Sequence, residues 1–289
     1  MSESVNEQGR ETLAERARRV KSLAEGIRAQ SEELYGLVVG HGGLSKTDGR
    51  SEDAEKPLGS AFPLESHKVG FLTIPSDIDE LPQLTLGAGQ RLISPNKIDL
   101  RSWNLAPKDQ KGSPKCAAFA AASYAENILW RKNSYPQKVD PAWIYDDAKK
   151  IDGNPKSPGT SLVAVLQAML NRGMFNPMHC TIKVLRTIDQ VKLAIHKYGT
   201  CLIGVMVTGE YYLCNRNKHS VCGEGAQGFL GGHAIQCVGF QPDGLICRNS
   251  WGERFGYDGN FIIEWKQLER QFMYGATYDN PLYDFHMVD

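Results

Sequence analysis

The chain has 289 residues, a formal net charge of zero and 41% hydrophobic residues. This length and composition suffice for a two-lobed core, and the balanced charge excludes a strong attraction to nucleic acid or to an anionic membrane. No apolar run approaches the ~20 residues that span a bilayer, and the N-terminus lacks the apolar part of a signal peptide. We therefore expect a cytoplasmic globular protein with no nucleic-acid or membrane partner. Export by a route without a signal peptide stays open.

The cysteines predict neither a disulfide framework nor a metal site. There are seven of them, an odd number, and no two have metal-ligand spacing such as C-x-x-C. No metal and no cofactor is expected. Cys214 and Cys222 form the one loop pair that is worth testing for a disulfide.

The first 95 residues divide into a helical part and a polar part. Within 1–39, apolar residues seven apart from Leu13 to Leu34 predict an amphipathic helix with a weak coiled-coil seam. This helix either packs on its own chain or, through residues 8–39, binds a protein partner or a second copy. Residues 40–95 begin as a polar linker up to 68. Short apolar pieces broken by prolines follow and fit one or two edge strands.

A turn-rich loop delivers one cysteine to the start of an Ala-rich helix. Gly112 and Pro114 prevent a helix upstream, whereas the run from Ala117 onward favours one. Cys116 therefore lies at or just before the first helical turn. There the unsatisfied N–H groups and the helix dipole favour a thiolate, so we expect a lowered pKa and take Cys116 as the candidate nucleophile.

The rest of the chain reads as helices followed by strands. Asp140 before Pro141 predicts the start of a second helix, and Thr160 or Ser161 caps a third. A short helix is expected at 189–198. The strand-like runs are 201–207, 234–240, 245–248 and 260–264. This order predicts an α+β protein with a helical lobe and an antiparallel sheet lobe.

Two of these strands form a hairpin that brings a histidine and an asparagine together. A Pro-Asp-Gly turn joins them, so His233 and Asn249 can be neighbours across the pair. An amide beside an imidazole fixes its tautomer and orientation, which is the third role in a nucleophile, base and orienter set. Trp251 is placed to cover that hydrogen bond.

Four segments, taken in order, resemble those of the papain-like cysteine peptidases, in particular the bacterial members that lack secretory features. The similarity covers about residues 96–270. The matching segments are 99–101 with 108–116 (strand, glutamine and nucleophile), 159–161 (the glycine segment of the substrate cleft), 232–234 (the histidine strand), and 249–252 with 256–259 (the asparagine segment and the next turn).

The resemblance implies an α+β, papain-like two-lobed fold for residues 96–289. In that fold an active-site cleft lies between a helical left lobe and an antiparallel, barrel-like right lobe. The implied catalytic residues are Cys116, His233, Asn249 and, as oxyanion donor, Gln110. The implied substrate-binding residues are Gly159, Thr160, Gly232, Ala234 and Trp251.

The departures from the family pattern lie beside the nucleophile. Ser113, Pro114 and Ala117 stand where members usually have a disulfide cysteine, a glycine and a tryptophan. One structural disulfide is therefore lost, while all four implied catalytic residues are kept.

The sequence thus predicts a cofactor-free cysteine endopeptidase that acts on a protein or peptide through a Cys116 thiolate and a His233 imidazolium. A thiol acyltransferase or deamidase of the transglutaminase kind is one alternative. A non-catalytic peptide-binding scaffold is another. In many family members an N-terminal segment inhibits the cleft, so residues 69–95 have two interpretations, a pro-like inhibitor or edge strands.

Overall fold

The computed structural model describes residues 72–85, 95–215, 217, 220–221 and 229–281. The helix expected within 8–39, the linker at 40–68 and Cys222 lie outside these residues. Within the described residues, no helix has both the length and the apolar character needed to cross a membrane.

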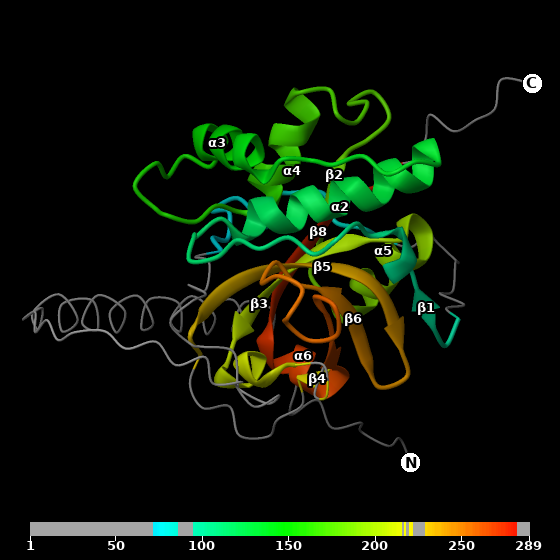
Figure 1. The fold of residues 1–289 in the computed structure, drawn as a ribbon. Coiled ribbons are helices and arrows are strands. Elements are labelled where there is room, and N and C mark those ends of the chain that lie inside the picture. The colour runs from blue at the N-terminus through cyan, green and yellow to red at the C-terminus, as the bar shows by residue number, and fades with distance from the viewer. Residues whose placement is uncertain (1–71, 86–94, 216, 218–219, 222–228, 282–289) are drawn as a thin grey trace, which may run out of the picture. The chain divides into compact units, whose positions relative to one another are not determined.

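Three helices pack together as one layer: α2 (Cys116–Asn133), α3 (Pro141–Ile151) and α4 (Leu162–Asn171) (Figure 1). α2 begins at Cys116, as predicted. The Asp140 side chain accepts the N–H of Ala142 at the start of α3, which confirms the predicted cap. At α4 the capping residue is Ser161 and not Thr160, since its hydroxyl accepts the N–H of Ala164.

α2 packs against α3 and α4 on one side and against β5 of the sheet on the other (Figure 1). Its alanines are almost all buried, and Ala118, Ala121, Ala122 and Ala125 are inaccessible to solvent. Because alanine adds only a methyl group, the backbones on both sides of α2 can approach closely. The Ala-rich sequence therefore allows α2 to be covered on two sides.

One sheet forms the other layer, and consecutive neighbours in it are hydrogen-bonded. Its order is β2 (Ile182–Leu185), β8 (Phe272–Tyr278), β3 (Cys201–Val207), β5 (Gly231–Gln241), β6 (Gly244–Arg248), β7 (Asn260–Glu264) and β4 (Ser220–Val221), with β1 (Ile98–Asp99) paired to β5. These pairings are antiparallel except that of β4 with β7, which is parallel. The remaining elements are η1 (Arg101–Trp103), α5 (Ile188–Tyr198), η2 (Gly209–Leu213) and α6 (Trp265–Gln271).

The hairpin of β5 and β6 is the predicted one, and Gln241 pairs with Gly244 across its turn. β5 begins three residues earlier than expected, so His233 lies inside the strand. β8 was not predicted, although it lies between β2 and β3 in the sheet. Successive side chains of β5 pack in two different hydrophobic cores. Ala234 packs in the core that includes α2, α3 and α4, called here the helical core. Ile235 packs in a second core made largely by the strands, called here the sheet core.

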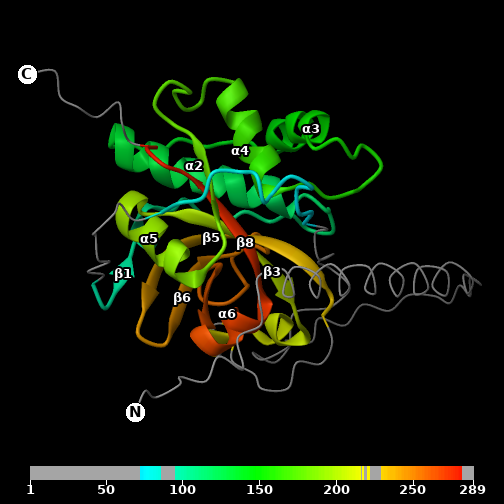
Figure 2. The same ribbon diagram turned by 180° about the vertical axis from the view of Figure 1, so that it is seen from behind.

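The segment 72–85 crosses from one core to the other. Leu72 is buried in the helical core and Leu84 in the sheet core. Near its end the segment pairs with β2: Val184 donates its N–H to Pro82 O at 2.8 Å, and Leu84 donates its N–H to Val184 O at 3.2 Å. Seen from behind, this segment, coloured cyan, passes between the helical layer and the sheet (Figure 2).

Candidate active site

Cys116 is the first residue of α2, and it is almost fully buried (1% exposed). The backbone N–H of Ala234 in β5 lies near enough to the sulfur to lower the pKa of the thiol. Burial raises the pKa of the Cys116 thiol from 9.0 to about 11 and outweighs the lowering effect of that N–H and of the N–H groups of Cys116 and Ala117. The lowered pKa expected from the helix terminus is therefore wrong for this buried thiol.

His233 is fully buried and directly precedes Ala234, the residue that contacts the thiol. Its Nε2 lies 2.8 Å from Oδ1 of Asn249, and the same oxygen accepts the backbone N–H of Ser250 at 2.8 Å. An amide oxygen only accepts, so Nε2 is the donor and Nδ1 is the basic nitrogen of the neutral ring. The predicted histidine and asparagine are therefore neighbours, with the imidazole in a defined orientation.

Trp251 lies against this pair, as the sequence led us to expect. Its ring centroid is 5.0 Å from that of His233, at an interplanar angle of 38°. The indole is itself held by Tyr212, which stacks on it at 5.1 Å, and by the edge contact of Phe255 at 5.0 Å. Trp251 is itself only 1% exposed. The aromatic cluster therefore shields one side of the His233 ring from solvent and restricts its movement.

Gln110 reaches the same region because its loop is bonded to the segment after β6. Gln110 donates its backbone N–H to Ser250 O at 2.8 Å, and the Ser250 hydroxyl donates to Gln110 Oε1 at 2.6 Å. The Gln110 amide nitrogen donates to Ser113 O at 2.9 Å, and the Ser113 hydroxyl donates to Gln110 O at 2.7 Å. Ser113 thus closes the loop with hydrogen bonds.

Ser250 was not predicted as part of the site. Its hydroxyl orients the Gln110 amide, but nothing in the local Asn-Ser-Trp pattern indicates a contact 140 residues away. A second contact that was missed is the buried pair of Lys108 and Glu126, whose Nζ and Oε1 are 2.7 Å apart. Lys108 O also accepts the N–H of Gly252 at 3.0 Å. The glutamine loop is therefore tied to α2 on one side and to the asparagine segment on the other.

Two of the predicted substrate-binding residues contact the chain's own segment 72–73. Leu72 donates its N–H to Gly232 O at 3.4 Å, and Thr73 donates its N–H to Thr160 O at 3.3 Å. The Tyr274 hydroxyl donates to Thr73 O at 2.9 Å. Two adjacent residues thus link the segment before α4 to the strand of His233.

Glycines make room for the Leu72 side chain. A Cβ added at Gly204 of β3 would lie 2.2 Å from Leu72 Cδ2, and one added at Gly232 would lie 3.2 Å from Leu72 O. Any larger residue at Gly204 would therefore displace Leu72. The small residues of β3 and β5 form an apolar site that a leucine fills.

No disulfide joins two cysteines of the described residues, and all six of these cysteines are buried. Three of them lie in register across neighbouring strands, Cys201 and Cys247 each opposite Cys237. Burial raises the pKa of Cys237 well above its usual range. These three are core thiols, and the proposed partner of Cys214 lies outside the described residues.

The fold was compared with known proteins. No protein-family model matches the chain, and neither does any curated protein sequence. Among solved structures, xylellain, a cysteine protease from Xylella fastidiosa, is similar with a TM-score of 0.60 at 18% identity over 74% of this chain and 97% of xylellain. ProCathepsin B from Trypanosoma congolense has a TM-score of 0.56 at 16% identity, over 73% of this chain and 86% of its own. Recombinant stem bromelain precursor has a TM-score of 0.57 at 16% identity, over 73% of this chain and 77% of its own.

These likenesses, together with the helical layer packed on an antiparallel sheet, confirm the predicted α+β class. The chain has the papain-like fold of these cysteine proteases. At identities of 16–18% the likeness concerns the fold.

Proposed function

We propose that the chain is a cysteine endopeptidase that hydrolyses peptide bonds of protein or peptide substrates. One observation carries the proposal: the His233 Nε2 to Asn249 Oδ1 hydrogen bond of 2.8 Å lies on the strand whose next residue, Ala234, contacts the Cys116 sulfur. Nucleophile, base and orienter thereby belong to one site. A buried structural cysteine would not need an oriented imidazole beside it.

The reaction would proceed in two steps. Cys116 Sγ attacks the carbonyl carbon and its proton passes to His233 Nδ1, which then protonates the leaving amine as the C–N bond breaks. A thioester with Cys116 results. Water, deprotonated by the same imidazole, attacks the thioester and releases the acid and the thiol. Asn249 keeps the ring in the tautomer that both steps need.

The negative charge that develops on the substrate's carbonyl oxygen must be stabilised by hydrogen-bond donors. The Gln110 amide and the backbone N–H of Cys116 at the start of α2 are the proposed pair. The Gln110 amide is supported for this role by Ser250 and Ser113, which fix its orientation before substrate arrives. Such preorganisation avoids the cost of rotating the amide during the reaction.

The proposal includes a latent state in which residues 72–73 occupy part of the substrate path. Their backbone N–H groups are bonded to Gly232 O and Thr160 O, which an extended peptide substrate would otherwise use. While Cys116 stays buried, its pKa of about 11 keeps it protonated at neutral pH. Displacement of the segment would admit water and substrate and would reduce the desolvation that raises this pKa.

The test is the cleavage of a fluorogenic peptide library by the full chain, with products identified by mass spectrometry. Cys116→Ala should abolish cleavage without loss of fold, and Cys180→Ala, a change at another buried cysteine, should keep it. Cleavage by Cys116→Ala would refute the assignment. Ammonia release from glutamine without chain cleavage would indicate the acyltransferase alternative. Alkylation of Cys116 with neither reaction would indicate a peptide-binding scaffold.

A further inference from the structure

The loop between α3 and α4 carries Gly159 and Thr160 but has no helix or strand of its own. Most of its residues from 153 to 158 are exposed, so packing does not fix it, whereas Gly159 and Thr160 are buried. Thr160 O already accepts the N–H of an extended segment, that of Thr73. The position of this carbonyl therefore decides how a peptide backbone is held beside the histidine strand.

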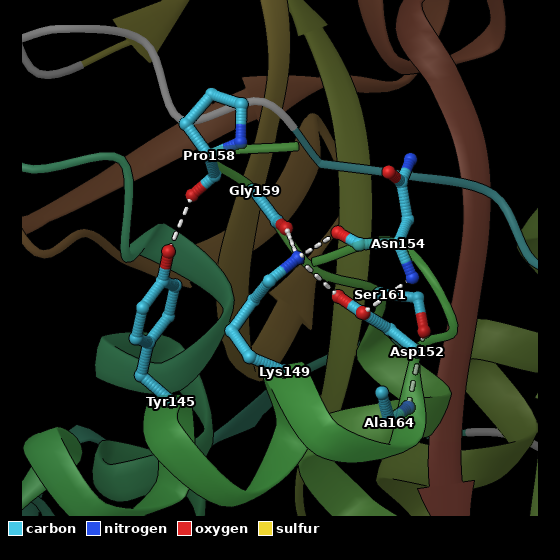
Figure 3. Close-up of polar contacts among 8 residues, drawn as sticks. All are labelled: Tyr145, Lys149, Asp152, Asn154, Pro158, Gly159, Ser161 and Ala164. Carbon is cyan, nitrogen blue, oxygen red and sulfur yellow. Dashed lines mark hydrogen bonds and ion pairs between the residues drawn. The ribbon is translucent and has the colours of Figure 1, made fainter. Parts of the chain in front are cut away.

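One side chain, Lys149 in the last turn of α3, makes three hydrogen bonds to this loop (Figure 3). Its Nζ donates to Asp152 Oδ2 at 2.7 Å, to Asn154 O at 2.6 Å and to Gly159 O at 2.9 Å. An ammonium group has three N–H donors, and here each has an acceptor from a different part of the loop. The lysine thus links the beginning, the middle and the end of the loop.

Neighbouring contacts extend this support in both directions. The Tyr145 hydroxyl, one turn earlier in α3, donates to Pro158 O at 2.8 Å (Figure 3). The ring of Tyr145 also lies under the ammonium of Lys115, 4.6 Å from its centroid, and Lys115 directly precedes Cys116. Beyond Thr160, Ser161 caps α4. Both sides of Thr160 are therefore fixed, and α3 connects the loop to the nucleophile.

We propose that Lys149 is a positioning residue that holds the Gly159–Thr160 backbone where it can bind a peptide substrate next to Cys116. This rests on the proposed function in so far as the bound peptide is a substrate. The Lys149 and Asp152 side chains are only 14% and 4% exposed, so the charge pair is shielded from water and its geometry is constrained. Lys149 acts through Gly159 and takes no part in the reaction itself.

The experiment compares two reagents that alkylate Cys116 in the full chain. A peptidyl epoxide with three residues before its reactive group reaches Thr160, whereas iodoacetamide does not. Intact mass follows each alkylation and gives its second-order rate constant. The ratio of the two rate constants measures peptide positioning without requiring turnover. Changes in the general accessibility of Cys116 affect both reagents and cancel in the ratio. Lys150→Met is the matched control, because this adjacent lysine is 75% exposed and pairs with Asp147.

Lys149→Met should lower the ratio about tenfold or more, since small displacements of a positioning group weaken reaction strongly. Because this change leaves Asp152 as a buried unpaired charge, the double variant Lys149→Met/Asp152→Asn is measured beside it with a melting curve for each. Lys150→Met should leave the ratio within about twofold of the wild type. An unchanged ratio in a folded Lys149 variant, or no preference for the peptidyl reagent in the wild type, would overturn the proposal. A wild type that prefers the peptidyl reagent yet cleaves no peptide would instead refute the proposed function.

Discussion

Shortening Leu72 should raise the proposed peptidase activity. Leu72 is 7% exposed and fills the site between Gly204 and Gly232. Leu72→Ala removes most of that apolar contact, which is worth about 2 kcal/mol for a leucine that leaves a buried site. If residues 72–73 compete with substrate, this loss weakens their occupancy of the site about 30-fold, since ~1.4 kcal/mol corresponds to a factor of ten. The kcat/KM for a peptide substrate should rise by up to that factor.

The assay measures kcat/KM of full-length wild type and variant on one fluorogenic peptide. Leu84→Ala is the matched control, because Leu84 is 4% exposed, lies in the same segment and packs in the sheet core beside β2. Its shortening should lower the melting temperature without activation. Activation by Leu72→Ala but not by Leu84→Ala would show that the activity rises because residues 72–73 leave the substrate path, and not because the fold is destabilised in general.

Two results would refute the reasoning. If Leu72→Ala leaves kcat/KM unchanged while the fold is intact, residues 72–73 do not compete with substrate. If it lowers kcat/KM, Leu72 supports the site, and the segment belongs to the peptidase core.

Three further predictions concern other parts of the chain. Gln110→Ala should lower kcat about 10²- to 10³-fold with little change in KM, because an oxyanion donor acts on the transition state; a normal kcat with a raised KM would mean that Gln110 only binds substrate. Cys116→Ala should reduce the alkaline loss of stability. The native thiol, with a pKa of about 11 against 9.0, binds its proton more tightly than the unfolded chain. Stability is therefore lost as pH rises from about 9 to 11, and urea unfolding at pH 8 and pH 11 should show a fall that is about 2 kcal/mol larger in the wild type. An equal fall in both proteins would contradict the burial effect. Deleting residues 1–60 should leave kcat intact, with light scattering reporting any change in assembly; aggregation or loss of a cooperative melt would mean that the deleted residues are part of the folded core.

Local signals in the sequence were enough to predict most elements of the helical layer. The starts of α2, α3 and α4 follow from Gly112 and Pro114, from Asp140 before Pro141, and from the cap at Ser161. The hairpin of β5 and β6 followed from its turn, and with it the proximity of His233 and Asn249. These features depend on groups a few residues apart, so the sequence contains them directly.

The tertiary structure decided the features that join distant parts of the chain. β8 was not predicted, and its place between β2 and β3 depends on partners that lie 67 to 96 residues away in the sequence. The contact of Ser250 with Gln110, which lie 140 residues apart, also required the assembled fold.

The pKa of Cys116 shows the physical reason most clearly. Its place at a helix N-terminus is a local property and favours the thiolate, but its burial depends on how the two layers pack, and burial dominates. Whether residues 69–95 would form edge strands or lie beside the site was equally undecided by composition. The packing pairs 82–84 with β2 and bonds 72–73 to Gly232 and Thr160, and inhibition of the site by this segment stays a prediction. Caps and turns are encoded within one or two turns of chain, whereas desolvation and occupancy of a site are set by whatever residues the complete fold brings against it.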